Sequence, residues 1–339
     1  MSVTTSTTST TDPLLDVREL SVAFTRKDRA DVHAVDGVSF TVSPGETVGL
    51  VGESGSGKSV TSLAVMGLLP DRGVRVSGEV VYDGDDLLTL PSDRMCDIRG
   101  RDIAMVFQDP MSSLNPVIPI GVQVTEVLQR HQNLKGDTAD SAAADLLARV
   151  GIPDPSRRLK EYPHQLSGGM RQRALIAMAL ACQPRLLIAD EPTTALDVTI
   201  QAQILELLRE MVRDSGAALV MITHDLGVVA GLCDSVHVMY SGRVVESAGR
   251  RELFAAPRHP YTGGLLASVP RLDAPRGQPL HPIPGSPTDV LAWSEGCAFA
   301  PRCRNRVEQC TTSTPVLESI GGRSLRCFNP LPAREEVPA

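Results

Sequence analysis

The sequence predicts an α/β fold in which helices cover both faces of a mostly parallel sheet. Short, continuous apolar runs alternate with segments of helical periodicity, as in parallel strands joined by crossover helices. A glycine-rich loop follows one of these runs, and polar or charged residues follow several others directly. Sheets of this kind bind their ligands at the carboxyl ends of the strands, so these observations predict one site at that edge.

The composition argues against two classes of protein, broad nucleic-acid binders and membrane-spanning chains. The chain has 339 residues with 42% hydrophobic content, which is enough for a large core. Its net charge of −7 argues against broad nucleic-acid binding, which needs a basic face. No apolar run approaches the roughly 18 residues of a membrane-spanning helix. Residues 1–12 begin with a run of Ser and Thr and are predicted to be a disordered tail. We therefore expect a cytosolic chain that reaches a membrane only through a partner.

The first strands are predicted within residues 14–42, where apolar and polar residues mostly alternate. Phe24, one of only six phenylalanines, lies in this stretch. Two interpretations of Phe24 stay open at this point. The ring packs in the core, or it stacks on an adenine base.

A phosphate-binding loop follows the apolar run at residues 48–51. The spacing of glycine, four residues, glycine, lysine and serine is the G-x-x-x-x-G-K-[ST] pattern. Its glycines let successive backbone N–H groups point at one anion, the lysine binds β- and γ-phosphates, and the serine hydroxyl is a ligand for Mg²⁺. The predicted nucleotide-binding residues here are Gly52, Glu53, Ser54, Gly55, Ser56, Gly57, Lys58, Ser59 and Val60.

The next elements are predicted in alternation. Residues 60–69 form a helix stopped by a proline, and residues 74–81 form a strand. A buried strand over residues 102–107 ends at Gln108. Residues 120–160 contain helical patterns and no strand pattern.

Ser167, Gly168 and Gly169 begin a helix that is predicted to continue to Cys182. The serine caps this helix, and the two glycines allow close approach of an anion. Taken alone, Ser-Gly-Gly is also an ordinary loop sequence, so this segment does not by itself indicate a site.

Two carboxylates follow the strand predicted at residues 186–189. They are Asp190 and Glu191: one carboxylate beside a phosphate loop can hold Mg²⁺, and a second can orient or deprotonate water. The alternative is a solvated acidic turn. An amphipathic helix over residues 199–213 and a strand over 218–222 come next. His224 follows that strand and therefore lies at the same edge of the sheet.

The combination of these motifs resembles the ATP-binding subunits of ABC transporters, over about residues 14–250. The motifs occur in the order and spacing of that family. They are the phosphate loop at 52–59, Gln108, the segment 166–169, Asp190 with Glu191, the segment 195–197, and His224.

The resemblance implies a role for each position. Asp190 and Ser59 would organise Mg²⁺ with Gln108 nearby, Glu191 would polarise the attacking water, and His224 would contact the γ-phosphate. Lys58, Gln108, Glu191 and His224 would thus form the catalytic set. Across an interface, Ser167, Gly168 and Gly169 would bind ATP held by a second ATPase subunit, with Asp197 at that interface. Phe24 matches the adenine-stacking position loosely.

The resemblance also implies a domain organisation. Residues 13–255 would form the ATP-binding domain, with an antiparallel β subdomain and a helical subdomain over about 109–180. Residues 256–339 would form a small cysteine-containing C-terminal extension. One cassette and an acidic charge balance disfavour the alternative of a soluble ABC ATPase that acts on ribosomes or DNA.

Finer features resemble the oligopeptide/dipeptide permease branch. They are the segments at 107–116, 162–173 and 259–262. Nickel and glutathione importers share much of this pattern. The resemblance implies an ATPase at the cytoplasmic face of the membrane. Its partners would be a second, different ATPase chain, two permease subunits and, indirectly, an extracellular peptide-binding protein.

Four cysteines in the C-terminal extension predict a metal site. Cys297, Cys303, Cys310 and Cys327 are separated by five, six and sixteen residues. Four thiolates suit zinc or an iron–sulfur cluster, and free thiols are the third alternative. The spacing matches neither a close zinc pair nor a ferredoxin run. The resemblance to the peptide-permease branch implies a [4Fe–4S] cluster.

Overall fold

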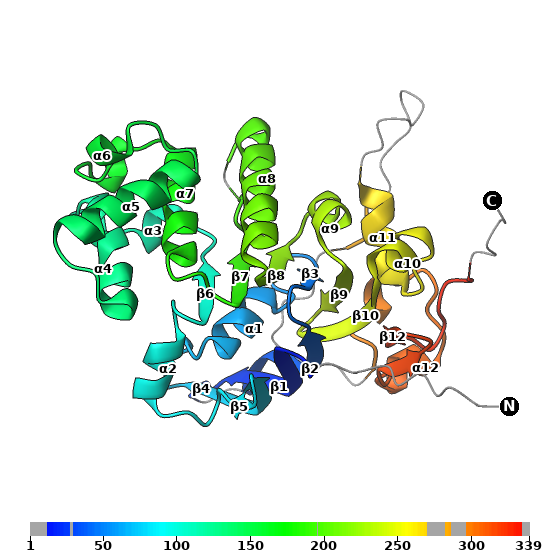
Figure 1. The fold of residues 1–339 in the computed structure, drawn as a ribbon. Helices are drawn as coiled ribbons and strands as arrows, with labels where there is room; N and C mark the ends of the chain where they lie inside the picture. The colour runs from blue at the N-terminus through cyan, green and yellow to red at the C-terminus, as the bar shows by residue number, and fades with distance from the viewer. Residues whose placement is uncertain (1–11, 28–29, 195, 270–281, 286–295, 334–339) are drawn as a thin grey trace, which may run out of the picture.

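A computed structural model describes residues 12–27, 30–194, 196–269, 282–285 and 296–333 (Figure 1). The predicted tail at 1–12 therefore lies outside the described residues except for its last position. The described residues form two sheets with helices around them. None of the described helices combines the length and apolar character needed to cross a membrane.

The larger sheet has a parallel centre, as the sequence predicts. Its strand order is β11-β12-β10-β9-β3-β8-β7-β6. The five strands from β9 to β6 are parallel, whereas β10, β12 and β11 pair antiparallel. The strands are β3 (Thr47–Val51), β6 (Ile103–Val106), β7 (Leu186–Asp190), β8 (Ala218–Thr223), β9 (Ser235–Tyr240), β10 (Arg243–Gly249), β11 (Glu318–Ile320) and β12 (Arg323–Leu325).

The smaller sheet is antiparallel and has the order β2-β1-β4-β5. Its strands are β1 (Leu15–Phe24), β2 (Val32–Val42), β4 (Val74–Tyr82) and β5 (Asp85–Asp86). Strand β1 pairs with both long neighbours, but its register shifts near Glu19, whose φ is 47°. This irregularity interrupts the alternation of apolar residues along β1.

Two apolar clusters fill the two faces of the larger sheet. Val48 and Leu50 of β3 pack into the cluster shared with the smaller sheet, and Val51 packs into the cluster on the helical side. Strand β7 divides in the same way, with Ile188 on one side and Leu187 on the other. Because both faces are buried, the strands are continuous apolar runs.

Helices α3–α7 lie together on one side of the larger sheet, at the left of Figure 1. The described helices are α1 (Lys58–Val65), α2 (Ser92–Ile98), α3 (Pro110–Ser113), α4 (Ile120–Gln132), α5 (Asp137–Arg149), α6 (Pro155–Arg158), η1 (Pro163–Gln165), α7 (Gly168–Leu180), α8 (Val198–Ser215), α9 (Leu226–Leu232), α10 (Arg250–Ala255), α11 (Pro260–Ser268), η2 (Ala300–Arg302) and α12 (Gln309–Thr312). Helix α1 ends earlier than predicted, because Gly67 adopts a φ of 59° before Pro70 is reached.

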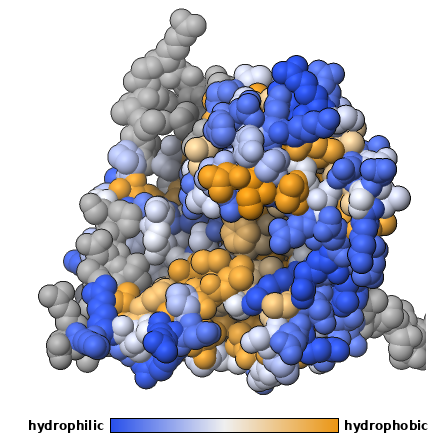
Figure 2. Space-filling model, turned by 90° about the vertical axis from the view of Figure 1, so that its left-hand side faces the viewer, coloured by the Kyte–Doolittle hydropathy of each residue, from blue (hydrophilic) through white to orange (hydrophobic). Residues whose placement is uncertain are grey.

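Figure 2 shows the face that is on the left in Figure 1. Two groups of apolar residues lie near its centre around a shallow hollow, and hydrophilic residues surround them. Exposed large apolar residues on β6, α3, α4 and the loops beside them include Phe107, Met111, Val117, Val122 and Tyr162.

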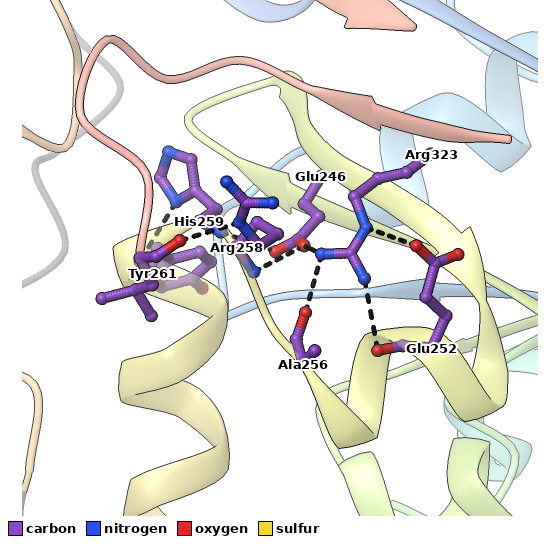
Figure 3. A network of polar contacts seen from close by, with 8 residues as sticks. Glu246, Glu252, Ala256, Arg258, His259, Tyr261 and Arg323 are labelled. Carbon is purple, nitrogen blue, oxygen red and sulfur yellow. Dashed lines mark hydrogen bonds and ion pairs between the residues drawn. The ribbon is translucent and has the colours of Figure 1, made fainter. Parts of the chain in front are cut away.

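Strands β11 and β12 continue the larger sheet, although they come from the predicted C-terminal extension. Glu246 of β10 is fully buried and its carboxylate accepts a hydrogen bond from Arg323 of β12 at 2.9 Å. The same carboxylate accepts the backbone N–H groups of Arg258 (2.8 Å) and His259 (2.9 Å) (Figure 3). This network attaches residues 256–261 and β12 to the core. The division of the chain at residue 256 stays a prediction.

Candidate functional site

The loop between β3 and α1 curls because of its glycines. Gly57 has a φ of 101°, and a Cβ there would lie 2.5 Å from the carbonyl oxygen of Ala34. A Cβ on Gly52 would lie 2.3 Å from the carbonyl oxygen of Met239. Glycine is therefore the only residue that fits at either position without a shift of the backbone. Gly55 has open space beside it, on the exposed side of the loop.

Lys58 opens helix α1 and its side chain folds back over the loop. Its Nζ donates to the carbonyl oxygens of Gly52 (2.8 Å) and Glu53 (3.0 Å). Burial lowers the pKa of Lys58, while the charges of Glu191, Asp190 and Glu53 oppose that shift. The structure therefore holds a cation at the centre of the predicted phosphate site, next to the positive end of α1.

Ser59 and Asp190 meet at the edge of the sheet. The Ser59 hydroxyl donates to Oδ1 of Asp190 at 2.9 Å. Burial raises the pKa of Asp190, and the hydrogen bond from Ser59 opposes the shift. Hard oxygen ligands of this kind suit Mg²⁺, so these two side chains fit that ion. A bound Mg²⁺ would neutralise negative charge on the phosphate oxygens.

Three polar side chains lie around one carboxylate oxygen of Glu191. Oε2 accepts hydrogen bonds from Gln108 (3.1 Å) and Thr194 (2.8 Å), and Nδ1 of His224 lies 3.4 Å away. Residue 191 has a φ of 44° and donates its N–H to Ile222 of the neighbouring strand. The predicted residues Gln108, Glu191 and His224 therefore lie together. Thr194 was not predicted, although a hydroxyl three residues after the carboxylate was visible in the sequence.

Ser167, Gly168 and Gly169 lie at the start of α7 on the helical side. Ser167 Oγ caps the helix by accepting the N–H of Met170 at 3.3 Å, as predicted from the sequence. A Cβ on Gly169 would lie 2.8 Å from a methyl group of Ile200 in α8. These contacts give two of the three residues a packing role within the chain. Their binding of a second nucleotide stays a prediction.

Asp197 and Phe24 also have structural roles here. Asp197 caps α8, and its carboxylate accepts the N–H of Ile200 at 3.0 Å. Phe24 ends β1 opposite Val32 and packs, partly exposed, against the cluster shared by the two sheets. The predicted interface role of Asp197 and the predicted adenine stacking of Phe24 stay predictions.

The prediction of a [4Fe–4S] cluster is wrong. Within the described residues, which include all four cysteines, no group of three or more His, Cys, Asp or Glu side chains is arranged to hold a metal ion. The four residues are free thiols. Burial raises the pKa values of Cys297 and Cys303 and raises that of Cys327 to about 11. Within the described residues, the same arrangement does not fit zinc.

Two residues of the C-terminal region reach the phosphate loop and were not predicted. The backbone N–H of Glu53 donates to the Tyr261 hydroxyl at 2.9 Å. The Glu53 carboxylate pairs with both terminal nitrogens of Arg302, at 2.6 and 3.0 Å. No local pattern marks such contacts, because they join residues more than 200 positions apart.

Two families match different parts of the chain. Residues 35–194 match the family described as ABC transporter. Residues 245–310 match the family described as oligopeptide/dipeptide transporter, C-terminal region. The first match contains the phosphate loop, Gln108, the start of α7 and both carboxylates.

Individual relatives match over most of their length. The oligopeptide transport ATP-binding protein OppD of Escherichia coli (strain K12) is 50% identical over 320 residues, or 94% of each chain. The dipeptide transport ATP-binding protein DppD of Bacillus subtilis (strain 168) is 52% identical over 305 residues, or 90% of each chain. A solved dimeric, post-hydrolysis state of the ATP-binding cassette MJ0796 bound to ADP and Pi is 28% identical. Its TM-score is 0.62, covering 70% of this chain and 99% of that chain. The chain therefore belongs to the family of ABC transporter ATP-binding subunits, in its oligopeptide/dipeptide branch, and is an ABC-type ATPase.

Proposed function

We propose that this chain powers the import of peptides, as the ATP-hydrolysing subunit of a membrane complex. The observation that carries the proposal is the meeting of Ser59 with Asp190 and of Glu191 with Gln108 and His224 at one edge of the sheet. Peptides are the proposed cargo because OppD and DppD, which are named for oligopeptide and dipeptide transport, are about half identical to this chain over most of its length.

In this proposal, each side chain around the loop has one task. Lys58 and the N–H groups at the start of α1 bind the phosphates of ATP. Glu191 accepts a proton from the attacking water, which Gln108 and His224 help to orient. The hydrogen bond from Thr194 fixes the rotamer of the Glu191 carboxylate. Most of the catalysis is positioning and electrostatic stabilisation.

A second ATPase subunit completes the site in this proposal. Ser167 and Gly169, at the positive end of α7, would bind the γ-phosphate of ATP held by that subunit. The solved structure of MJ0796 supports this, since that cassette is described as dimeric. We propose that the second subunit is a different, homologous chain.

Two permease subunits would dock on the helical side and hold the chain at the cytoplasmic face of the membrane. The support is the set of exposed apolar side chains there, which include Met111 (58% exposed), Val117 (77%) and Val122 (54%). Figure 2 shows apolar residues around a hollow on the face of the molecule where helices α3–α7 lie. Exposed apolar surface of this kind is typical of protein–protein interfaces.

Uptake in a strain that lacks the gene for this chain tests the proposal. Cells carrying the wild-type gene or Lys58→Ala are given a labelled dipeptide, tripeptide, hexapeptide, glutathione or nickel. We expect peptide uptake to be restored by the wild type alone. Restoration of nickel or glutathione uptake without peptide uptake would replace peptide by that cargo. Recovery of ribosomes, and not of permeases, with the tagged chain would contradict a transport role.

A further inference from the structure

Glu53 is the point where the C-terminal region contacts the phosphate loop. Its side chain is paired with Arg302, its N–H is bound by the Tyr261 hydroxyl, and its carbonyl oxygen accepts from Lys58. The carboxylate, the N–H and the carbonyl oxygen of Glu53 therefore all have polar partners. Two of these partners, Arg302 and Tyr261, lie outside residues 35–194, which match the ABC transporter family. We propose that Arg302 and Tyr261 are positioning residues for ATP: through Glu53 they set the conformation and charge of the phosphate loop.

Arg302 is built into the C-terminal region as a rigid donor. Its side chain is 4% exposed, its Nε donates to the carbonyl oxygen of Pro284 at 2.9 Å, and its guanidinium lies 5.9 Å from the centre of the Tyr240 ring. The donors of a guanidinium lie in one fixed plane. The hydrogen bond from Nε to Pro284 therefore also orients the two terminal nitrogens. Both oxygens of Glu53 accept from the opposite edge, which makes the pair bidentate.

The side chain of Tyr261 is also fixed in position, by burial and by contacts with other aromatic rings. It is fully buried in α11, and its ring lies 4.7 Å from that of Tyr240 and 5.3 Å from that of Phe299. The helix itself is capped by His259, which is bound to Glu246 in the network of Figure 3. The position of the Tyr261 hydroxyl is thus fixed by the docking of the C-terminal region on the core.

The charge of Glu53 explains why the pairing matters for ATP. The carboxylate belongs to a loop that must bind a polyanion, and it acts electrostatically on Lys58. Unpaired, it would repel phosphate and compete for that cation. Arg302 neutralises it from the side of the C-terminal region. The inference rests on the proposed role of the loop in binding phosphate.

The test measures binding of a fluorescent ATP analogue with Mg²⁺ on the purified full-length chain, and it measures KM and kcat for ATP on the assembled transporter. We expect Arg302→Gln to raise the Kd for the analogue and the KM for ATP by roughly fivefold to tenfold, with kcat changed less than about twofold. Tyr261→Phe removes a single oxygen and should raise Kd by about threefold. Amide hydrogen exchange over residues 52–59 should quicken in both variants. Arg306→Gln, an exposed arginine in the same segment, is the matched control.

A double variant separates charge from folding. Glu53→Gln combined with Arg302→Gln should bind the analogue more tightly than Arg302→Gln alone, because the unpaired carboxylate is gone. A general loss of packing would leave the double variant no better than the single one. Wild-type Kd, KM and exchange in both Arg302→Gln and Tyr261→Phe would overturn the inference. Lys58→Ala is measured beside them: if it too binds the analogue normally, the phosphate-loop assignment fails instead.

Discussion

The Ser59 hydroxyl donates to the carboxylate of Asp190 at 2.9 Å, although 131 residues separate the two positions. The contact joins the helix after the phosphate loop to the tip of β7. Strands β3 and β7 both pair with β8 in parallel, so their carboxyl ends lie at one edge. Strand topology alone therefore brings a phosphate-binding loop and two carboxylates into one site.

Replacing Lys58 by alanine should abolish ATP binding. The ammonium is the buried cation of the loop, and charge-assisted hydrogen bonds to phosphate are the strong ones. We expect the Kd for ATP to rise by at least about 100-fold, which is roughly 2.7 kcal/mol. Titration with a fluorescent ATP analogue measures it. The exposed Lys160→Ala is the control and should bind as the wild type does. Unchanged binding by Lys58→Ala would remove the loop from the site.

Ser167 should have two separable effects. Ser167→Ala removes the cap of α7 and should cost about 1 kcal/mol of unfolding free energy. Ser167→Asp keeps a capping acceptor but puts negative charge where we propose that a phosphate binds. Both variants should lower the rate of hydrolysis in the assembled transporter by at least about tenfold, while only the alanine variant loses stability. An aspartate variant as active as the wild type would show that the residue is only a cap.

Glu246 should matter for stability more than its neighbour Glu252. Glu246 is fully buried and binds Arg323 and two backbone N–H groups, so Glu246→Gln should lower the free energy of unfolding by about 3 kcal/mol. Glu252 also pairs with Arg323 but its side chain is 49% exposed. Glu252→Gln should therefore cost less than about 1 kcal/mol. Urea unfolding of both variants checks the difference, and equal losses would contradict this account of the C-terminal region.

Two buried histidines should make stability fall in mild acid. Burial lowers the pKa of His259 to about 3 and that of His237 to about 4. The unfolded chain binds these protons near pH 6.5, whereas the folded chain does not. Stability should therefore fall as the pH drops from about 6.5 towards 4, by up to about 1.4 kcal/mol per pH unit for each histidine.

His259→Asn tests this dependence directly. Asparagine keeps an acceptor for the N–H of Tyr261, which His259 Nδ1 accepts at 3.0 Å, but it does not titrate. The slope of unfolding free energy between pH 6 and pH 5 should decrease by about 1 kcal/mol per unit. A variant with the slope of the wild type would show that His259 is protonated in the folded chain.

The site was predictable where its residues lie within contiguous motifs or follow directly after buried strands. Lys58 and Ser59 belong to a local pattern, and Glu191 and His224 each follow an apolar run whose strand type was clear. Strand pairing then brings these ends together by a general rule. The same rule predicted the parallel sheet, since strands buried on both faces are continuous apolar runs.

The remaining contacts depend on tertiary structure that no local signal encodes. Arg302 reaches Glu53 across 249 positions, from a proline-rich stretch without periodicity. Strands β11 and β12 have three residues each, too few to show an alternating pattern. The cysteine prediction failed for a related reason. The sequence gives the number of cysteines and the residues between them, but it does not determine whether their thiols lie around one metal position.

Hydrolysis by Glu191→Gln is the most direct test of the central claim, that this carboxylate acts on water at the phosphate loop. The variant should bind ATP with Mg²⁺ within about twofold of the wild type and lose at least about 100-fold in steady-state hydrolysis. Glu210→Gln, an exposed glutamate on α8, should hydrolyse ATP normally. Hydrolysis by Glu191→Gln at the wild-type rate would contradict the claim.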